Sequence, residues 1–309
     1  MSVHAVERVK QLMDCLVNQA ITPLVAACEE IEQVERWLED SESLTQYRNF
    51  LALSTARGVL DGSTAVHYLG NFKADAWQRA RDRTRILLAS GAIPTLEFPP
   101  GAAPDLLVIC TFVIEQYRYG EMVAVREGDV FLDCGACCGE TALWAEKAGA
   151  GKVWSFEPNP EALDYMSRNI QKHGQGRIEP VPLGLSAAPG QMNMERYPTN
   201  IGGTRLVAGE HGALTVPVVT LDDWCRENKV KPDFIKMDLE GAEVDVLNGA
   251  RGVIMEHKPK LAICLYHRLA DMWVIPRLIK EMVPEYRFWC RENAPTGEFV
   301  LYATVDKRQ

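Results

Sequence analysis

Along the first third of the chain, apolar side chains recur at intervals of three and four residues. The spacing is clearest over residues 3–13 and 31–38, and it places these side chains on one face of an α-helix. Seven acids and one arginine fill residues 29–42, and arginines alternate along residues 79–85. Such charge runs are typical of solvated helix faces, so we predict helices up to about residue 92.

A proline-dense stretch between Pro94 and Pro104 ends this helical pattern. Prolines this close together cannot continue a helix and favour an extended connection. We therefore predict a domain boundary here. The first domain, residues 1–105, is helical and a candidate substrate lid or oligomerisation module, and the second domain covers residues 106–309.

Beyond the boundary, short runs rich in β-branched and aromatic residues alternate with helical stretches. The pattern predicts strands at residues 130–134, 152–157, 178–185, 216–221, 233–238, 261–266, 286–290 and 299–304, with helices at 140–148, 160–173 and 243–249. This alternation is typical of a mostly parallel sheet covered on both faces. We predict an α/β, doubly wound sheet that binds its ligand at the carboxyl ends of the strands.

The segment Asn193–His211, with its Gly202-Gly203 pair, falls between two predicted strands. We expect it to form a long loop that closes over the ligand as a lid. Specificity for the ligand is then expected to depend on this lid, on the helical first domain and on aromatic residues such as Trp273 and Trp289.

Composition excludes several classes of protein. The longest near-apolar run, Leu106–Ile114, has nine residues, whereas a membrane-spanning helix needs about 20. The first residues also lack the basic segment followed by an apolar segment that is typical of a signal peptide. We therefore expect a cytoplasmic protein. The nine cysteines sit mostly in apolar runs and read as free buried thiols. A net charge of −9 argues against a nucleic-acid partner.

The strongest local signal lies where the strand at 130–134 meets the helix at 140–148. Asp133 ends the strand, and Gly135 and Gly139 frame a turn of small residues before the helix. Glycines let the backbone approach a ligand closely, and the free amides of a helix start suit an anionic group. The spacing G-x-x-x-G lacks the middle glycine of the dinucleotide pattern G-x-G-x-x-G.

Glu157 follows the next predicted strand, in the sequence Phe156-Glu157-Pro158-Asn159-Pro160. An acid at this position can accept hydrogen bonds from both hydroxyls of a ribose. The alternative is an acid that only offsets the dipole of the following helix. Together, the glycine turn and the acid indicate a cofactor that contains a nucleoside.

Three motifs now resemble one family. They are Asp133-x-Gly135-Ala136-x-x-Gly139-Glu140-Thr141, the Phe156–Pro160 sequence, and Asp233-Phe-Ile-Lys-Met-Asp238-Leu-Glu240-Gly-Ala-Glu243. In order and spacing they resemble class I S-adenosylmethionine-dependent methyltransferases of the FkbM type, over roughly residues 110–305. The resemblance implies a Rossmann-like, seven-stranded sheet and methylation of hydroxyl groups on sugars or natural products. The chain departs from the family at the Cys137-Cys138 pair and in its helical first part.

The resemblance also implies a set of contacts to S-adenosylmethionine. The methionine end would be bordered by Gly135, Ala136, Gly139 and Thr141, with Asp133 tightening the loop from beneath and Tyr117 as a cover. The ribose would be held by Glu157, with Pro158 and Asn159 shaping the rim, and adenine would lie near Leu185 and Ser186.

Methyl transfer to a hydroxyl needs in-line alignment and a group that takes the proton. Asp238, at a predicted strand end, is our first candidate base, Glu240 the second and His267 the third. Lys236 is expected to form a salt bridge with Asp238. We expect no metal, because the next strand end offers few oxygen ligands beyond Asp271.

Other interpretations remain open at this point. A zinc or redox role for Cys134, Cys137 and Cys138 lacks the second cysteine pair that structural zinc usually needs. A nicotinamide-dependent oxidoreductase is disfavoured by the missing glycine, and the chain could instead be a docking protein with a vestigial pocket. The partner is expected to be a small or glycosylated molecule, and a homodimer is left open.

Overall fold

The computed structural model describes residues 21–56, 74–197, 200–207, 214–295 and 297–306. The helices are α2 (Thr22–Ala26), α3 (Cys28–Trp37), α4 (Ser41–Ala56), α6 (Ala74–Ala89), α7 (Pro104–Ile109), α8 (Glu140–Lys147), α9 (Pro160–His173), α10 (Leu221–Asn228), α11 (Glu243–Asn248), α12 (Arg251–His257) and α13 (Asp271–Met282), with a π-helical turn, η2 (Cys110–Ile114). The helices predicted for residues 1–20 and 57–73 lie outside the described residues.

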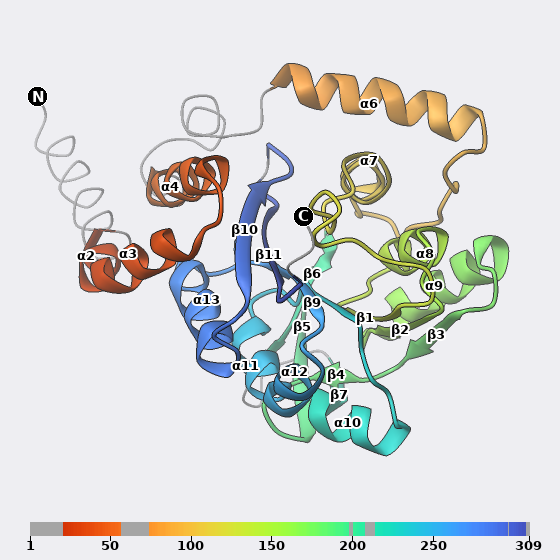
Figure 1. Cartoon of the computed structure of the whole chain (residues 1–309). Coiled ribbons are helices and arrows are strands. Elements are labelled where there is room, and N and C mark those ends of the chain that lie inside the picture. The colour runs from red at the N-terminus through yellow and green to blue at the C-terminus, as the bar shows by residue number, and fades with distance from the viewer. Residues whose placement is uncertain (1–20, 57–73, 198–199, 208–213, 296, 307–309) are drawn as a thin grey trace, which may run out of the picture.

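A seven-stranded sheet forms the centre of the protein (Figure 1). Its strands are β1 (Val130–Cys134), β2 (Lys152–Phe156), β3 (Ile178–Val181), β8 (Phe234–Met237), β9 (Lys260–Cys264), β10 (Arg287–Glu292) and β11 (Phe299–Thr304). They lie in the order β10-β11-β9-β8-β1-β2-β3, and β11 runs antiparallel to both of its neighbours. The predicted α/β, mostly parallel fold is confirmed. The strand order reverses between β1 and β8, which is where such sheets bind ligands.

Two hydrophobic clusters cover the two faces of this sheet. Leu132 and Ile235 point into one cluster, together with side chains of α3, α4 and α10–α13. Phe131 and Phe234 point into the other, together with side chains of α7, η2 and α8. The alternation follows from the two-residue period of a strand. Since both faces are buried, the strands read as continuous apolar runs.

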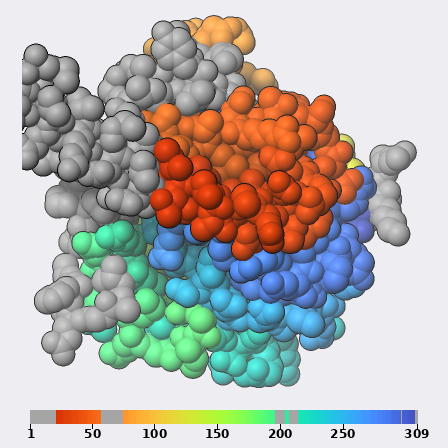
Figure 2. Space-filling view, turned by 90° about the vertical axis from the view of Figure 1, so that its left-hand side faces the viewer, coloured from red at the N-terminus to blue at the C-terminus, as the bar shows by residue number. Residues whose placement is uncertain are grey.

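The helices at the start of the chain pack on both sides of the sheet. Helices α3 and α4 lie against β10 and α13, and they cover much of the surface in the view of Figure 2. The Tyr47 hydroxyl donates to the Met272 carbonyl (3.0 Å), and the Phe50 and Phe299 rings stack 4.4 Å apart. Helix α6 contacts α7 and η2. The first helices thus share their core with the sheet, and the domain division near residue 105 stays a prediction.

The prediction that Asn193–His211 forms a lid loop is wrong, because the described part of this segment forms strands. Strands β5 (Gly190–Tyr197) and β6 (Asn200–Val207) pair antiparallel, and β5 also pairs with β7 (Leu214–Val219). With β4 (Gly184–Leu185) they form a second, four-stranded sheet. The glycine pair indicated a loop, but it lies in β6, which forms a hairpin with β5, and β5 is held in the sheet by β7 on its other side. The strand predicted at 178–185 is divided between the two sheets.

Candidate active site

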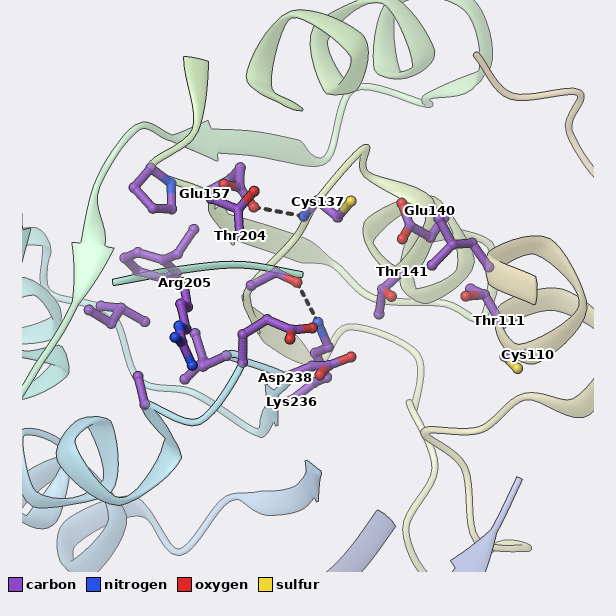
Figure 3. Close-up of a pocket in the computed structure, with 18 of the residues that line it drawn as sticks. Cys110, Thr111, Cys137, Glu140, Thr141, Glu157, Thr204, Arg205, Lys236 and Asp238 are labelled. Carbon is purple, nitrogen blue, oxygen red and sulfur yellow. Dashed lines mark hydrogen bonds between the residues drawn. The ribbon is translucent and has the colours of Figure 1, made fainter. Parts of the chain in front are cut away.

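A cavity of about 400 Å³ opens at the carboxyl ends of β1, β2, β8 and β9 (Figure 3). Helix α7 and η2 form one wall, and residues Thr204–Leu206 of β6 form another. Its volume falls in the range of small-molecule sites, roughly 300–1,000 Å³. The cavity therefore lies at the reversal of strand order, where the sequence predicted a ligand.

Two glycines shape the turn after β1. Both Gly135 and Gly139 have φ of 85°, a left-handed backbone conformation that residues other than glycine rarely adopt. A Cβ on Gly135 would lie 1.9 Å from the Asp238 carbonyl oxygen, and one on Gly139 would lie 2.9 Å from Met166 Cγ. The amides of Gly135 and Ala136 donate to the Phe156 carbonyl (3.1 and 3.0 Å). These contacts fix the loop against β2 and β8.

Asp133 and Lys236 form a buried ion pair beneath this turn. The Lys236 Nζ lies 3.1 Å from Asp133 Oδ1, with the two side chains 2% and 0% exposed. Lys236 also donates to the Gly135 carbonyl (2.6 Å). Burial alone would lower the pKa of Lys236, but Asp133 and Asp238 outweigh it and raise that pKa. The predicted salt bridge of Lys236 exists, but its partner is Asp133 and not Asp238, because neighbouring parallel strands place β1 and β8 side by side.

Glu157 stands at the edge of the cavity next to the same turn. Its carboxylate accepts from the amides of Cys137 (3.0 Å) and Asn159 (2.8 Å). Burial raises the pKa of Glu157 to about 7, although these two backbone donors oppose the rise. The Asn159 side chain in turn accepts from the Glu161 amide (3.1 Å) and caps α9. Asn159 therefore orders the loop that carries Glu157.

Two oxygen atoms at the wall lack hydrogen-bond partners among the described residues. They are Glu140 Oε2 and Gln116 Oε1, and both residues line the cavity. Burial raises the pKa of Glu140 to about 7. Buried acceptors without donors are rare in folded proteins, so this part of the wall suits a ligand that supplies hydrogen-bond donors.

Asp238 follows β8 at the end of the cavity away from Glu157, where its carbonyl faces Gly135 of the glycine turn. Its carboxylate accepts from the Tyr117 hydroxyl (2.8 Å) and the Tyr266 hydroxyl (3.1 Å). Burial would raise the pKa of Asp238, but Lys236, His267 and the two tyrosines lower it below its ordinary value. Asp238 is therefore held as a carboxylate whose two oxygen atoms have fixed directions.

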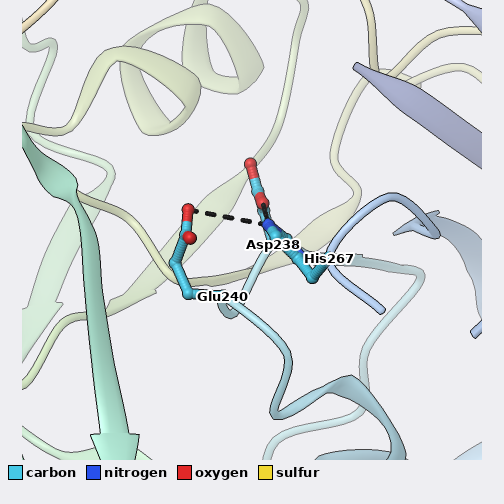
Figure 4. A group of neighbouring side chains, drawn as sticks. All are labelled: Asp238, Glu240 and His267. Atoms are coloured by element: carbon cyan, nitrogen blue, oxygen red, sulfur yellow. Dashed lines mark ion pairs between the residues drawn. The ribbon is translucent and has the colours of Figure 1, made fainter. Parts of the chain in front are cut away.

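His267 lies between three carboxylates. Its Nδ1 is 2.8 Å from Glu243 Oε1, and its Nε2 is 3.4 Å from Asp238 Oδ1 and 3.6 Å from Glu240 Oε1. Figure 4 shows the polar ends of Asp238, Glu240 and His267 turned toward one another. Burial opposes protonation, but Glu240 and Glu243 raise the pKa of His267 well above its ordinary value. Glu240 has a φ of 55°, the kind of backbone strain that gathers at functional sites.

The structure brings most of the predicted residues to one cavity. Its lining includes Tyr117, Gly135, Thr141, Glu157, Pro158, Leu185, Asp238 and Glu240. The other predicted residues lie outside the lining: Asp133, Ala136, Gly139, Asn159, Ser186 and His267. Sequence reasoning missed Gln116, Arg205 and Glu298, which line the cavity, and the buried Glu243, which pairs with His267. Among these, only Glu243 carried a signal, since it belongs to the motif that begins at Asp233.

Comparisons with known proteins give the family of the chain. A model of the methyltransferase FkbM domain matches residues 133–293. The hexuronic acid methyltransferase AglP of Haloferax volcanii is 33% identical over 215 residues, which cover 65% of this chain and 87% of that protein. Methyltransferase sdnD of Sordaria araneosa is 29% identical over 152 residues, 38% of this chain and 59% of that protein.

A solved structure supports the fold. The methyltransferase FkbM of Methylobacillus flagellatus aligns with a TM-score of 0.56 and 21% identity, over 91% of this chain. The chain spans about 60% of the length of that protein. In the part of the chain that the structure describes, no helix combines the length and the apolar character needed to cross a membrane.

Proposed function

Because the chain belongs to the FkbM methyltransferase family and is an S-adenosylmethionine-dependent enzyme, we propose that it methylates a hydroxyl oxygen of a sugar or small natural product. One observation carries the proposal. A single cavity joins Glu157 at one end to the carboxylate of Asp238 at the other, and the glycine turn contacts both residues. Membership of this family excludes the nicotinamide-dependent oxidoreductase that the sequence left open.

The residues at the first end fit the cofactor. The unpartnered oxygens of Glu140 and Gln116 suit the ammonium group of its methionine part, and Thr141 and Gly135 border the same region. The carboxylate of Glu157 suits the hydroxyl groups of a ribose. Leu185 and Pro158 offer apolar surface beyond it. When bound, the cofactor supplies a methyl group that is already activated on a sulfonium sulfur.

The chain's own residues then align the acceptor and manage its proton. The acceptor oxygen forms a bond to the methyl carbon, the sulfur keeps the electron pair of the broken bond, and the hydroxyl proton passes to a wall carboxylate. Asp238, Glu240 and Glu298 are the carboxylates at this end of the cavity. Burial and the nearby Asp238 raise the pKa of Glu298 to about 7, a value suited to general-base catalysis near neutral pH.

An acidic sugar is the acceptor class to test first. A relative that is 33% identical is named for a hexuronic acid, and Arg205 supplies a guanidinium at the wall. Arg205 pairs with Glu195 (2.8 Å), but a guanidinium has five donors and can bind a second carboxylate. We further propose a cytoplasmic enzyme that acts on small molecules and not on nucleic acid, in keeping with the net charge of −9.

The test uses the full chain and two readouts. Calorimetry with S-adenosylmethionine and with its demethylated product measures cofactor binding. Mass spectrometry then follows a gain of one methyl group on free and nucleotide-linked hexuronic acids, neutral sugars and hydroxylated polyketides. Binding together with methylation of one of these hydroxyls supports the proposal. Binding without transfer to any acceptor would favour the docking protein with a vestigial pocket.

A further inference from the structure

We propose that Asp238, Glu240 and His267 form a binding site for a divalent transition-metal ion, such as Mn²⁺ or Zn²⁺. This inference rests on the proposed function, because it assigns a chemical role to the acceptor end of the same cavity. The sequence offered too few oxygen ligands for a metal. In the structure Glu240 supplies the missing oxygen ligand. Its own backbone is left-handed, and its carboxylate turns back toward His267.

The spacing of the three side chains matches ligands of one ion. One atom from each of Asp238, Glu240 and His267 lies within 4.8 Å of the other two. The Nε2 atom is 3.4 and 3.6 Å from the two carboxylate oxygens, longer than a hydrogen bond. Metal–ligand bonds of about 2.1 Å place neighbouring ligand atoms roughly 3.0–3.4 Å apart, in octahedral and tetrahedral sites respectively.

The imidazole itself points to a ligand. The His267 side chain is 7% exposed, and among the described residues neither ring nitrogen makes a hydrogen bond of normal geometry. The Nε2 atom faces only the carboxylates of Asp238 and Glu240, at ion-pair distance. On the other side of the ring, Nδ1 faces the fully buried Glu243 at 2.8 Å. A carboxylate behind a histidine is the usual way in which proteins orient a metal-binding imidazole. Glu243 is held in place because it also accepts from the Leu239 amide (2.7 Å).

The local charge also favours a divalent cation. Three carboxylates surround one imidazole, and the nearest lysine, Lys236, is already paired with Asp133. An ion with two positive charges would balance Asp238 and Glu240 and would displace the proton that these carboxylates otherwise favour on His267, leaving Nδ1–H directed at Glu243. Buried carboxylates are stable only when paired or bound to metal. A mixed set of one nitrogen and two oxygens suits Mn²⁺ or Zn²⁺ better than Mg²⁺ or Ca²⁺.

An ion at this position would act on the acceptor. Asp238 and Glu240 both line the cavity, so the open side of the site faces the methyl acceptor. Positive charge there lowers the pKa of a hydroxyl and fixes its direction. Since Asp238 and Glu240 are then ligands, Glu298 is left as the wall carboxylate that takes the proton.

The test measures metal binding directly, on full-length protein freed of metal by a chelator. Titration with Mn²⁺, followed by calorimetry and electron paramagnetic resonance, is expected to give one ion per chain, with a signature of a directly bound imidazole nitrogen. His267→Ala should remove that signature and weaken Mn²⁺ binding at least 10-fold. Glu240→Gln, at a partly exposed and therefore tolerant position, should also weaken binding at least 10-fold. Asp245→Asn is the matched control, because Asp245 is an exposed acid on α11, and its affinity should equal that of the wild type.

Each outcome separates this inference from the proposed function. Absence of stoichiometric Mn²⁺ and Zn²⁺ binding, or equal affinity in all variants, would overturn the metal site. Full methyl transfer in the presence of chelator would overturn it while leaving the proposed function intact. Metal binding at these residues without methylation of any hydroxyl acceptor would retain the site and overturn the proposed function.

Discussion

The two ends of the cavity are built in opposite ways. Around Glu157 most polar groups are paired within the protein: Glu157 accepts from two amides, and Gly135 and Ala136 donate to β2. Glu140 Oε2 and Gln116 Oε1 are the wall oxygens that lack a partner among the described residues. At the end formed by β8 and β9, three carboxylates crowd one imidazole, and the Nε2 of His267 lacks a hydrogen-bond partner among the described residues.

This difference indicates a division of labour. A turn that hydrogen bonds hold against β2 is rigid before any ligand arrives, which suits selective binding of one cofactor. At the second end, Asp238 and Glu240 are charged groups already held in place at the cavity, so they can act on charge that develops in a transition state. We therefore expect substitutions at the first end to affect folding and cofactor affinity, and those at the second end to affect turnover.

The largest effect is expected from Gly135→Ala. The new Cβ would lie 1.9 Å from the Asp238 carbonyl, on a residue with φ of +85°, so β1 and β8 would have to separate. The free energy of unfolding should fall by about 3 kcal/mol or more, with loss of cofactor binding. Urea denaturation measures the change. Gly176→Ala is the control, because its φ is +89° but nothing lies within 4 Å, and it should cost about 1 kcal/mol. Equal costs would show that the close approach to β8 is unimportant.

Asp238→Asn probes the other end of the cavity. The amide keeps the size of the side chain but loses the charge that Tyr117 and Tyr266 hold in place. We expect kcat to fall about 100- to 1,000-fold, while affinity for S-adenosylmethionine changes little. Stopped-time methylation assays and calorimetry give the two values. A variant with wild-type kcat would remove Asp238 from the reaction, and one that lost only cofactor affinity would reverse our assignment of the two ends.

Glu157→Gln should act on cofactor affinity alone. The glutamine oxygen can still accept from an amide, but it lacks the charge that strengthens hydrogen bonds to a diol. Affinity should fall roughly 10-fold, since hydrogen bonds to a charged group contribute about 1.5–3 kcal/mol. Glu179→Gln, an exposed acid on the neighbouring strand β3, should leave calorimetric affinity unchanged. A drop in kcat at saturating cofactor, without a change in affinity, would contradict the role of Glu157.

The last prediction concerns the pH dependence of stability. Burial raises the pKa of Glu140 from 4.5 to about 7 in the folded protein, so the folded state holds a proton that the unfolded state releases. The stabilising contribution of this carboxyl is complete below pH 4.5 and is lost as pH rises to about 7. Relative to Glu140→Gln, wild-type protein without cofactor should lose about 2–3 kcal/mol over this range. Urea titrations at several pH values measure it, and parallel pH profiles for the two proteins would refute the shift.

The sequence alone determined the sheet and the first end of the cavity. Strands at 130–134 and 299–304 and the helix at 160–173 begin and end where they were predicted, because their apolar runs and their proline and glycine boundaries are local features. The glycine turn and Glu157 were found for the same reason. Their strand-end placement and hydrogen bonds depend on residues within one β-α-β unit, whereas the close contacts of the glycines with Asp238 and Met166 come from outside it.

Only the tertiary structure decided the rest. Lys236 pairs with Asp133 instead of Asp238 because β1 lies beside β8. The segment predicted as a lid forms the β5–β6 hairpin, and pairing of β5 with β7 holds this hairpin in the second sheet. The cluster around His267 combines β8, β9 and α11, and Glu298 reaches the cavity from the turn before β11. Charges and hydrogen bonds act through space over a few ångströms, so a partner distant in sequence leaves no periodic trace in either segment.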